Sequence, residues 1–484
     1  FDACQMRGEQ LTQAIPLKVS VYNKLAYGFG SVAFGVKNNG FDYYFLLFYS
    51  QVMGVDAQLV GNALLLALMF DALSDPLIGY FSDKFHSSWG RRHPFMYFAA
   101  VPVAVSYYFL WNPPAELTGN ELFPFIVVMA VFIRTLITLY EIPSSALVAE
   151  MTTDYDERTS MLSYRYFFGW SGGTLMSFFA LTFLLVPTAA ASNGMFNVEG
   201  YGQMGLVAAS VMFVAIMVSA LGTHRFIPHL NAPPPKERMT IKRIYSDLWD
   251  TLANRSFLAL FLAALFGAIA TGLAAGLSFY LNTFFWEFSS SQQGIIAISV
   301  VLSAIIGFLV APYVSRTMGK KRGTIVVGIL AFSISPMPVL LRLFDVMPQN
   351  GDALLFPVIL VVTIVDVGLI ITFQTLMASM IADLVEASEV KTKRRSEGVF
   401  FSAISFTRKM VQGVGVVVAT FILTLAEIQP GATPDQVSAD SLFKLGAYYA
   451  PTIFFVWMIM IGFITLYRID RNTHVNNLKE IGRD

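Results

Sequence analysis

Long apolar runs alternate with short polar connections along the whole chain. Twelve of the runs are long enough to cross a bilayer as helices, because about 20 apolar residues span the hydrocarbon core. We expect these helices at 25–53, 58–82, 95–112, 123–149, 163–187, 203–223, 256–285, 292–315, 323–344, 354–382, 397–427 and 443–468. The pattern therefore predicts an all-α integral membrane protein with twelve transmembrane helices.

Basic residues collect in every second connection, whereas the connections between them hold almost none. The basic residues include Lys84, Arg91, Arg92, Arg158, Lys236, Arg238, Lys320, Lys321, Lys391 and Lys393. Lys and Arg of short loops stay on the cytoplasmic side. We therefore expect both termini in the cytoplasm and the protein in the cytoplasmic (inner) membrane. The longest connection contains Pro233-Pro234-Pro235 and then apolar residues at helical spacing, which predicts a linker with an amphipathic surface helix.

The two halves of the pattern repeat. Gly90-Arg91-Arg92 after the second run matches Gly319-Lys320-Lys321 after the eighth, an offset of 229. Ala149-Glu150 matches Ala382-Asp383 at an offset of 233. Nearly equal offsets indicate a duplicated six-helix unit, as in transporters that rock two halves around a central site. We expect a cytoplasmic N-terminus at 1–24, bundles of six helices at 25–223 and 256–468, a linker at 224–255 and a cytoplasmic tail at 469–484.

Composition supports the membrane assignment and excludes other classes. The chain is 55% hydrophobic and only 13% charged, against about 25% charged residues in soluble proteins. Its 32 basic and 32 acidic residues balance, which argues against a nucleic-acid partner. With Cys4 as its single cysteine, the chain can form no intrachain disulfide and no cysteine-ligated metal site. We expect no cofactor and no enzymatic activity, because no catalytic constellation is present.

Four charged residues lie deep inside the predicted helices. At 1.5 Å per residue, Asp75 and Glu141 lie roughly 12–13 Å in from the basic connections, and Asp71 and Lys409 roughly 18 Å in. Asp71 and Asp75 share one helix face, as do Thr138 and Glu141. Buried transmembrane charges are usually functional. Three carboxylates and a hydroxyl suit sodium, or the acids could take up a proton. The alternative is a fixed ion pair between Lys409 and an aspartate.

Further polar residues are candidates for substrate contact. A stripe along one face of the first predicted helix consists of Gly35, Asn38, Asn39 and Asp42. It predicts a cavity lining, with hydrogen bonding between helices as the alternative. Arg165 is either a substrate ligand or an interfacial cation. Arg134 and Asp366 lie at equivalent places, 232 positions apart, which leaves pairing across the halves and lining opposite walls as alternatives.

Several motifs resemble the glycoside–pentoside–hexuronide:cation symporters, a branch of the major facilitator superfamily. The motifs are Lys24-Leu25-Ala26-Tyr27-Gly28-Phe29-Gly30, Asp71-Ala72-Leu73-Ser74-Asp75-Pro76, Trp89-Gly90-Arg91-Arg92-His93-Pro94, Glu141-Ile142-Pro143 and Tyr164-Arg165-Tyr166-Phe167. The sodium-dependent lysophosphatidylcholine transporters of animals resemble the same branch. The likeness runs from Lys24 to about Arg468, and it implies two bundles of six helices that work by alternating access.

The resemblance also implies roles for individual residues. It places Asp71, Asp75, Thr138 and Glu141 at the family's cation-site positions, Lys409 near that site and Arg165 at a sugar-binding arginine. Three positions depart from the sugar-transporting pattern. Gly35 stands in place of a sugar-binding aspartate, and Ser145 and Gln374 stand in place of sugar-stacking tryptophans.

We therefore expect a cation-coupled symporter for a sugar, a glycoside or a uronate. Sodium or a proton would bind at Asp71, Asp75 and Glu141. The expected substrate contacts are Asn38, Asn39, Asp42, Arg165, Gln374 and Lys409, and the expected cytoplasmic gate is Asp83 with Gly90, Arg91 and Arg92. We expect a monomer whose partners are a small-molecule substrate, a coupling cation and the lipid bilayer. The alternatives are transport of a lysolipid or similar amphiphile, and a receptor or scaffold that does not transport.

Overall fold

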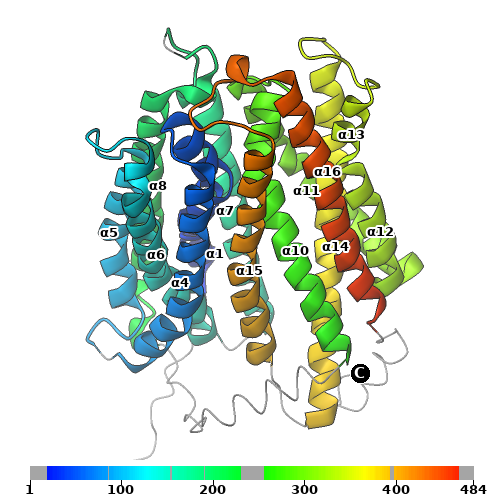
Figure 1. Ribbon diagram of the computed structural model, residues 1–484. Helices are drawn as coiled ribbons and strands as arrows, with labels where there is room; N and C mark the ends of the chain where they lie inside the picture. The colour runs from blue at the N-terminus through cyan, green and yellow to red at the C-terminus, as the bar shows by residue number, and fades with distance from the viewer. Residues whose placement is uncertain are drawn as a thin grey trace, which may run out of the picture.

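The computed structural model describes residues 19–85, 87–152, 155–189, 191–229, 255–392 and 397–467. All regular secondary structure in these ranges is helical (Figure 1). The surface helix expected after Pro235 lies outside the described residues, and so does most of the expected linker. The linker and tail boundaries therefore remain predictions.

The first half begins with an irregular helix that runs from Val21 to Val52. It consists of α1 (Val21–Phe29), α2 (Ser31–Asn39), the π-helical turn η1 (Gly40–Tyr44), α3 (Phe45–Leu47) and a second π-helical turn, η2 (Phe48–Val52). Then follow α4 (Ala57–Lys84), α5 (His93–Trp111), η3 (Gly119–Leu122), α6 (Phe123–Met151), α7 (Tyr155–Phe179), η4 (Ala180–Leu184), η5 (Gly194–Phe196), α8 (Val198–His224) and η6 (Ile227–His229).

The second half begins with α10 (Arg255–Tyr280), which also ends in a π-helical turn, η7 (Leu281–Phe285). It continues with α11 (Ser290–Met318), α12 (Lys320–Ile334), α13 (Met337–Leu343), α14 (Leu355–Thr392), α15 (Glu397–Leu425), η8 (Pro434–Gln436) and α16 (Ala439–Thr465). Side-chain caps begin several helices. The carboxylate of Asp56 accepts from the Gln58 amide before α4, and Ser289 and Gln292 form a capping box before α11.

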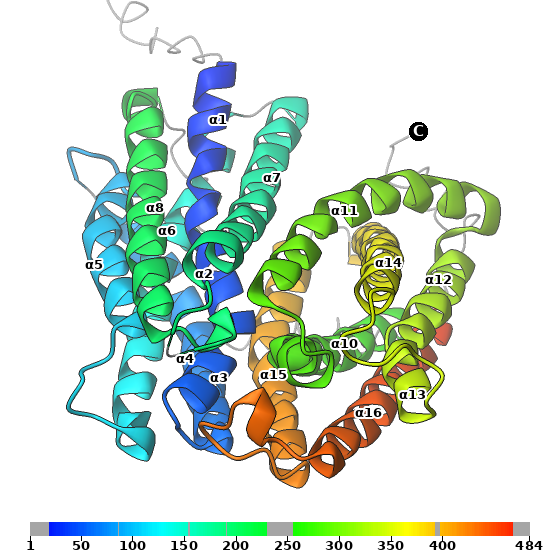
Figure 2. The same cartoon turned by 90° about the horizontal axis from the view of Figure 1, so that it is seen from above.

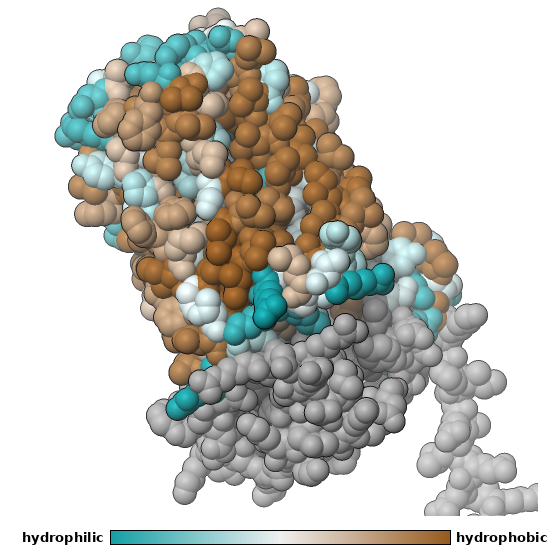
Figure 3. Space-filling model, turned by 90° about the vertical axis from the view of Figure 1, so that its right-hand side faces the viewer, coloured by the Kyte–Doolittle hydropathy of each residue, from teal (hydrophilic) through white to brown (hydrophobic). Residues whose placement is uncertain are grey.

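Ten stretches within the described residues are long and apolar enough to cross a membrane. The two other predicted runs correspond to the irregular helix from Val21 to Val52 and to α15. That these two also cross the membrane stays a prediction. Figure 3 shows a band of hydrophobic surface between hydrophilic areas, which is the arrangement that a surrounding bilayer requires.

The two halves lie side by side, with α1 to α8 in one group and α10 to α16 in the other (Figure 2). They repeat the same packing: α4 against α6, α2 against α7 and α5 against α8 correspond to α11 against α14, α10 against α15 and α12 against α16. The turns η2 and η7 begin 233 positions apart, at Phe48 and Leu281. This offset equals one that the sequence repeat gave, so the duplicated unit includes a π-helical turn.

Contacts between the halves gather at the end of the molecule opposite the described termini. The Gln51 amide group donates to the Tyr280 hydroxyl at 3.3 Å, and the Gly431 amide donates to the Ser50 carbonyl at 2.9 Å. Deeper in, α4 packs along α15. A Cβ at Gly413 would lie 2.7 Å from a Leu65 methyl carbon, so the missing side chain allows this close approach.

Candidate cation and substrate site

Two aspartates of the first half and one lysine of the second half meet where α4 packs against α15. The Lys409 ammonium lies 2.5 Å from Asp75 Oδ2 and 3.4 Å from Asp71 Oδ2. The Thr138 hydroxyl lies 3.1 Å from Asp71 Oδ1 and 3.2 Å from Asp75 Oδ1. Helix periodicity explains the arrangement, because residues four apart on α4 present both carboxylates to α6 and α15.

Arg134 completes this group, which we call the charged cluster: Asp71, Asp75, Arg134, Thr138 and Lys409. The Arg134 guanidinium lies 3.3 Å from Asp71 Oδ2. Arg134 and Thr138 are also four residues apart, so one turn of α6 faces one turn of α4. The Thr138 hydroxyl is also 2.9 Å from the Arg134 carbonyl, a bond that holds the rotamer of the threonine.

Exposure is uneven across the charged cluster. The side chains of Asp71 and Arg134 are 2% and 4% exposed, whereas those of Asp75 and Lys409 are 21% and 20% exposed. The Asp75–Lys409 end of the charged cluster is therefore accessible, and the Asp71–Arg134 end is almost fully enclosed by the protein. Oxygen atoms of this kind suit sodium or a proton. In the structure, the Lys409 ammonium supplies the positive charge next to both carboxylates.

Glu141 lies beside the charged cluster but does not join it. Its carboxylate makes no hydrogen bond or ion pair with any described residue, whereas its backbone carbonyl accepts from the Ser144 hydroxyl at 3.1 Å and from the Arg165 guanidinium at 3.3 Å. Within the described ranges, no three His, Cys, Asp or Glu side chains come close enough to hold a metal ion. The expected group of Asp71, Asp75 and Glu141 is therefore not assembled here, and sodium binding by these residues stays a prediction.

Arg165 is buried between α6 and the first helix. Its guanidinium donates to the Ser144 hydroxyl at 3.0 Å and lies over the rings of Phe34 and Tyr27, 5.2 and 5.9 Å from their centres. With 7% of its surface exposed, it is not an interfacial cation, so that alternative from the sequence is wrong. It forms no ion pair with a described carboxylate.

The residues of the polar stripe on the first helix have different surroundings in the structure. Asn38 is exposed, and the side-chain amide of Asn39 packs against α7 at Gly173, where a Cβ would lie 2.0 Å from it. Asp42 turns to the second half, where its carboxylate accepts from Gln412 at 3.3 Å. These places agree with helix contact for Asn39 and with a position between the halves for Asp42. Substrate contact by any of the three stays a prediction.

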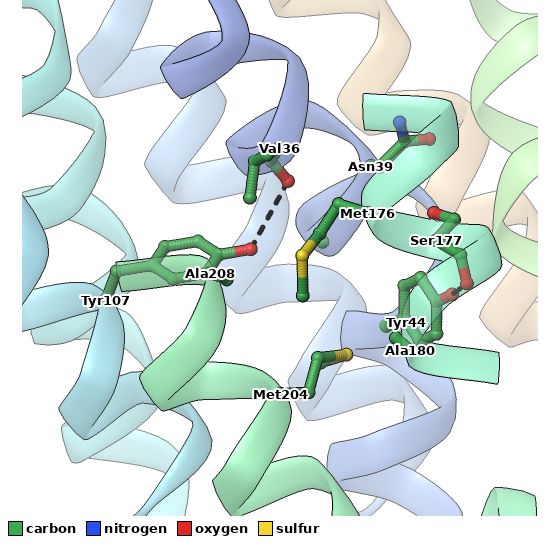
Figure 4. A pocket seen from close by; sticks show the side chains of 10 residues that line it. Val36, Asn39, Tyr44, Tyr107, Met176, Ser177, Ala180, Met204 and Ala208 are labelled. Atoms are coloured by element: carbon green, nitrogen blue, oxygen red, sulfur yellow. Dashed lines mark hydrogen bonds between the residues drawn. The ribbon is translucent and has the colours of Figure 1, made fainter. Parts of the chain in front are cut away.

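The void beside Asn39 is too small for a substrate. It lies inside the first half, where the Tyr107 hydroxyl donates to the Val36 carbonyl at 3.3 Å (Figure 4). The void offers a water-sized sphere only about 10 Å³, which is room for about one water molecule. Gln374, another expected contact, is exposed on α14.

The predicted gate is an ion-pair group within the first half. Arg91 and Arg92 lie 2.8 and 3.0 Å from Glu150 of α6, and Arg92 also donates to Ser82 of α4 at 2.7 Å. Gly90 has φ +73°, a conformation that favours glycine at the turn before α5. The Asp83 side chain lies outside the described residues.

Two features of the site were missed or misjudged from the sequence. Arg134 pairs with Asp71, so pairing with Asp366 across the halves is wrong, and Asp366 Oδ1 has no hydrogen-bond partner among the described residues. Lys37 was not among the expected site residues, but it is only 3% exposed and lies in electrostatic range of Asp71 and Glu141. Its charge inside an otherwise apolar predicted membrane helix was the available signal.

Comparisons with known proteins agree with this architecture. A model of the family described as "MFS/sugar transport protein" matches residues 26–471. An uncharacterized symporter of Synechocystis is 32% identical over 209 residues, which cover 42% of this chain and 37% of that protein. The isoprimeverose transporter of Lactiplantibacillus pentosus is 23% identical and covers 88% of this chain and 84% of its own length.

An animal protein and a solved structure extend the comparison. The sodium-dependent lysophosphatidylcholine symporter 1 of Mus musculus is 23% identical, over 96% of this chain and 88% of its own length. The xylose transporter XylE of E. coli, in a partially occluded inward open conformation, superposes with a TM-score of 0.59 at 13% identity. The superposition covers 93% of this chain and 98% of XylE, and it supports the major facilitator fold.

Proposed function

Because the chain belongs to the MFS/sugar transport protein family, we propose that it is a cation-coupled symporter for a sugar, a glycoside or a uronate. Relatives that match 81% to 96% of this chain are transporters and not enzymes. The observation that supports coupling best is the pairing of Lys409, from the second half, with Asp71 and Asp75 of the first. This pairing links the charge state of the site to the contact between the halves.

Coupling follows from competition for the same oxygen atoms. Sodium or a proton at Asp75 lowers the negative charge that holds Lys409, so the ion pair between the halves weakens. The two halves can then rock past each other, which is alternating access. A cation that favours substrate binding must itself be favoured by the substrate, and to the same extent, because coupling free energy is reciprocal.

The direction of access rests on the distribution of basic residues. We place both termini in the cytoplasm, so the end closed by the Gln51–Tyr280 bond faces outward. Arg91 and Arg92, bound to Glu150, then lie on the cytoplasmic side. In this proposal they fix the loop between α4 and α5 in the described state and release it when the bundles move.

A lysolipid is the second candidate cargo. The Ser145 hydroxyl bonds to its own helix, at the Ile142 carbonyl 2.8 Å away, and Gln374 is exposed, so neither offers the aromatic face on which a sugar ring stacks. The lysophosphatidylcholine symporter matches nearly the whole chain. These two points favour the amphiphile over any other class of cargo outside the sugars.

The Asp75→Asn variant tests the coupling. In proteoliposomes with a sodium or a proton gradient, we expect the variant to lose uphill uptake while it keeps exchange of substrate between the two sides. Asn keeps the size of the side chain but removes the charge for which a cation competes. Uphill uptake at the wild-type level would refute the proposed coupling site. Ligand binding without uptake by the wild-type protein would favour a receptor.

A further inference from the structure

We propose that Lys37 is the receptor for an anionic group of the substrate, either the carboxylate of a uronate-type sugar or the phosphate of a lysolipid headgroup. This inference rests on the proposed function, because it concerns the same transport site. It makes Lys37 a specificity-determining residue and predicts that an anionic cargo is preferred to its neutral counterpart.

Lys37 is a buried cation without a described partner. Only 3% of its surface is exposed, and its ammonium forms no hydrogen bond or ion pair with any residue that the structure describes. Removing an ammonium from water is costly unless an opposite charge and hydrogen bonds replace the lost hydration. A ligand that supplies both would remove this cost.

The nearest carboxylate is already engaged by other groups. Asp71 accepts from Thr138 at 3.1 Å and pairs with Arg134 at 3.3 Å and with Lys409 at 3.4 Å. Lys37 lies in electrostatic range of Asp71 without reaching ion-pair distance. It therefore adds positive charge to a carboxylate that has two cations beside it.

Local charge is consequently unbalanced in favour of an anion. Among the described side chains around Asp71 and Glu141, Lys37, Arg134, Arg165 and Lys409 are cationic, and Asp71, Asp75 and Glu141 are the carboxylates. These seven side chains, which are the charged cluster with Lys37, Arg165 and Glu141 added, carry one more positive than negative charge. Asp42, further along the first helix, has Gln412 of α15 as a hydrogen-bond partner. A bound carboxylate or phosphate would balance the charge of these seven side chains.

The position of Lys37 suits contact with a ligand. Lys37 lies in electrostatic range of Arg134, whose guanidinium sits 4.7 Å from the centre of the Phe41 ring. Arg165, the other buried cation without a described carboxylate partner, approaches the neighbouring turn of α6 at the Glu141 carbonyl and the Ser144 hydroxyl. A lysine contacts a carboxylate or phosphate as a compact point charge with three donors.

The experiment measures binding to the purified full-length protein by calorimetry and thermal shift. Two matched pairs of probes are used: glucuronate with glucose, and lysophosphatidic acid with the monoacylglycerol of the same acyl chain. We expect the wild-type protein to prefer the anionic member of one pair at least about tenfold, and that pair identifies the source of the anion. Lys37→Gln should lose the preference, and Lys37→Arg should keep it.

Stability without ligand separates a receptor from a structural lysine. If the Lys37 ammonium has no ionic partner in the ligand-free protein, Lys37→Gln should melt at a higher temperature than the wild type, because the substitution removes an uncompensated buried charge. If it supports Asp71, the variant melts lower. Lys444→Gln, which changes a more exposed lysine of the second half that pairs with Glu427 and Asp440, is the control for both measurements.

Three results would overturn the proposal: equal binding of both members of each pair by the wild-type protein, binding of neither anionic probe at millimolar concentration, and a lower melting temperature for Lys37→Gln. Failure of the proposed symport is a separate outcome. It would show as anion-selective binding that depends on Lys37, together with no uptake driven by a sodium or proton gradient.

Discussion

Removing the Lys409 ammonium should make the stability of the protein depend on added cation. In the structure, this ammonium is the positive charge closest to Asp75, at 2.5 Å, and it also reaches Asp71 at 3.4 Å. In Lys409→Gln, Asp71 keeps Arg134, but Asp75 keeps only the Thr138 hydroxyl. Two carboxylates on one helix face then repel each other until a sodium ion or a proton arrives.

The size of the effect follows from the geometry. Unit charges roughly 3.5 Å apart attract by about 5 kcal/mol at an effective dielectric constant of about 20. Desolvation of a partly buried ion costs several kcal/mol, and about a fifth of each side chain is exposed (21% and 20% for Asp75 and Lys409). A net loss of about 2 kcal/mol is expected, since double-mutant cycles on close charge pairs give about 1.5–7 kcal/mol.

The assay is thermal unfolding of the detergent-purified protein in choline chloride and in sodium chloride, each at neutral and at acidic pH. Without sodium, Lys409→Gln should be less stable than the wild type. Added sodium, or lower pH if the coupling ion is a proton, should stabilise the variant more than the wild type, because the competing ammonium is absent. Lys444→Gln should respond as the wild type does. An equal response of Lys409→Gln and wild type to both cations would refute competition at these carboxylates.

Two further predictions concern the packing between helices. A Cβ at Gly272 would lie 2.1 Å from the Gln412 carbonyl oxygen, so Gly272→Ala should cost roughly 1–3 kcal/mol of stability; Gly462→Ala, with no atom near the added carbon, should be neutral, and equal melting of the two variants would contradict the packing. Tyr280→Phe removes the hydroxyl that Gln51 binds between the halves, worth about 1 kcal/mol, so a cysteine introduced at the closed end should be labelled about fivefold faster, and an unchanged rate would mean that this bond does not hold the end shut.

Helix periodicity predicted the parts of the site that one helix determines by itself. Asp71 and Asp75 share a face because they are four residues apart, and their carboxylates do lie within reach of one hydroxyl, that of Thr138. Counting residues from the loops also placed Lys409 at the depth of Asp71, and the two are 3.4 Å apart. The position of a residue along the helix axis can be predicted from the sequence, because each α-helical residue advances the chain by a fixed rise.

Rotation about the helix axis could not be predicted. The prediction that Gly35, Asn38, Asn39 and Asp42 share one face holds only for an uninterrupted α-helix. In the structure, Asp42 lies in the π-helical turn Gly40–Tyr44. Its i→i+5 bonding changes the angle between successive side chains. Asn39 therefore packs on Gly173 while Asp42 turns to Gln412. The pairing of Arg134 with Asp71 depends on how α4 packs against α6. Periodicity within one helix carries no information about such packing.

Under the proposed coupling, the uneven exposure of the charged cluster would set the order in which an ion meets the two carboxylates. An ion arriving from water meets the Asp75–Lys409 pair first, since those side chains are 21% and 20% exposed, whereas Asp71 is only 2% exposed. In this proposal, the Lys409 side chain must rotate away from Asp75 before the ion can reach the Asp71 carboxylate. In the proposed mechanism, the rotation of this one side chain and not diffusion to the site would set the rate of ion binding. Such a step slows arrival and departure alike, so the ion would stay long enough for the halves to move.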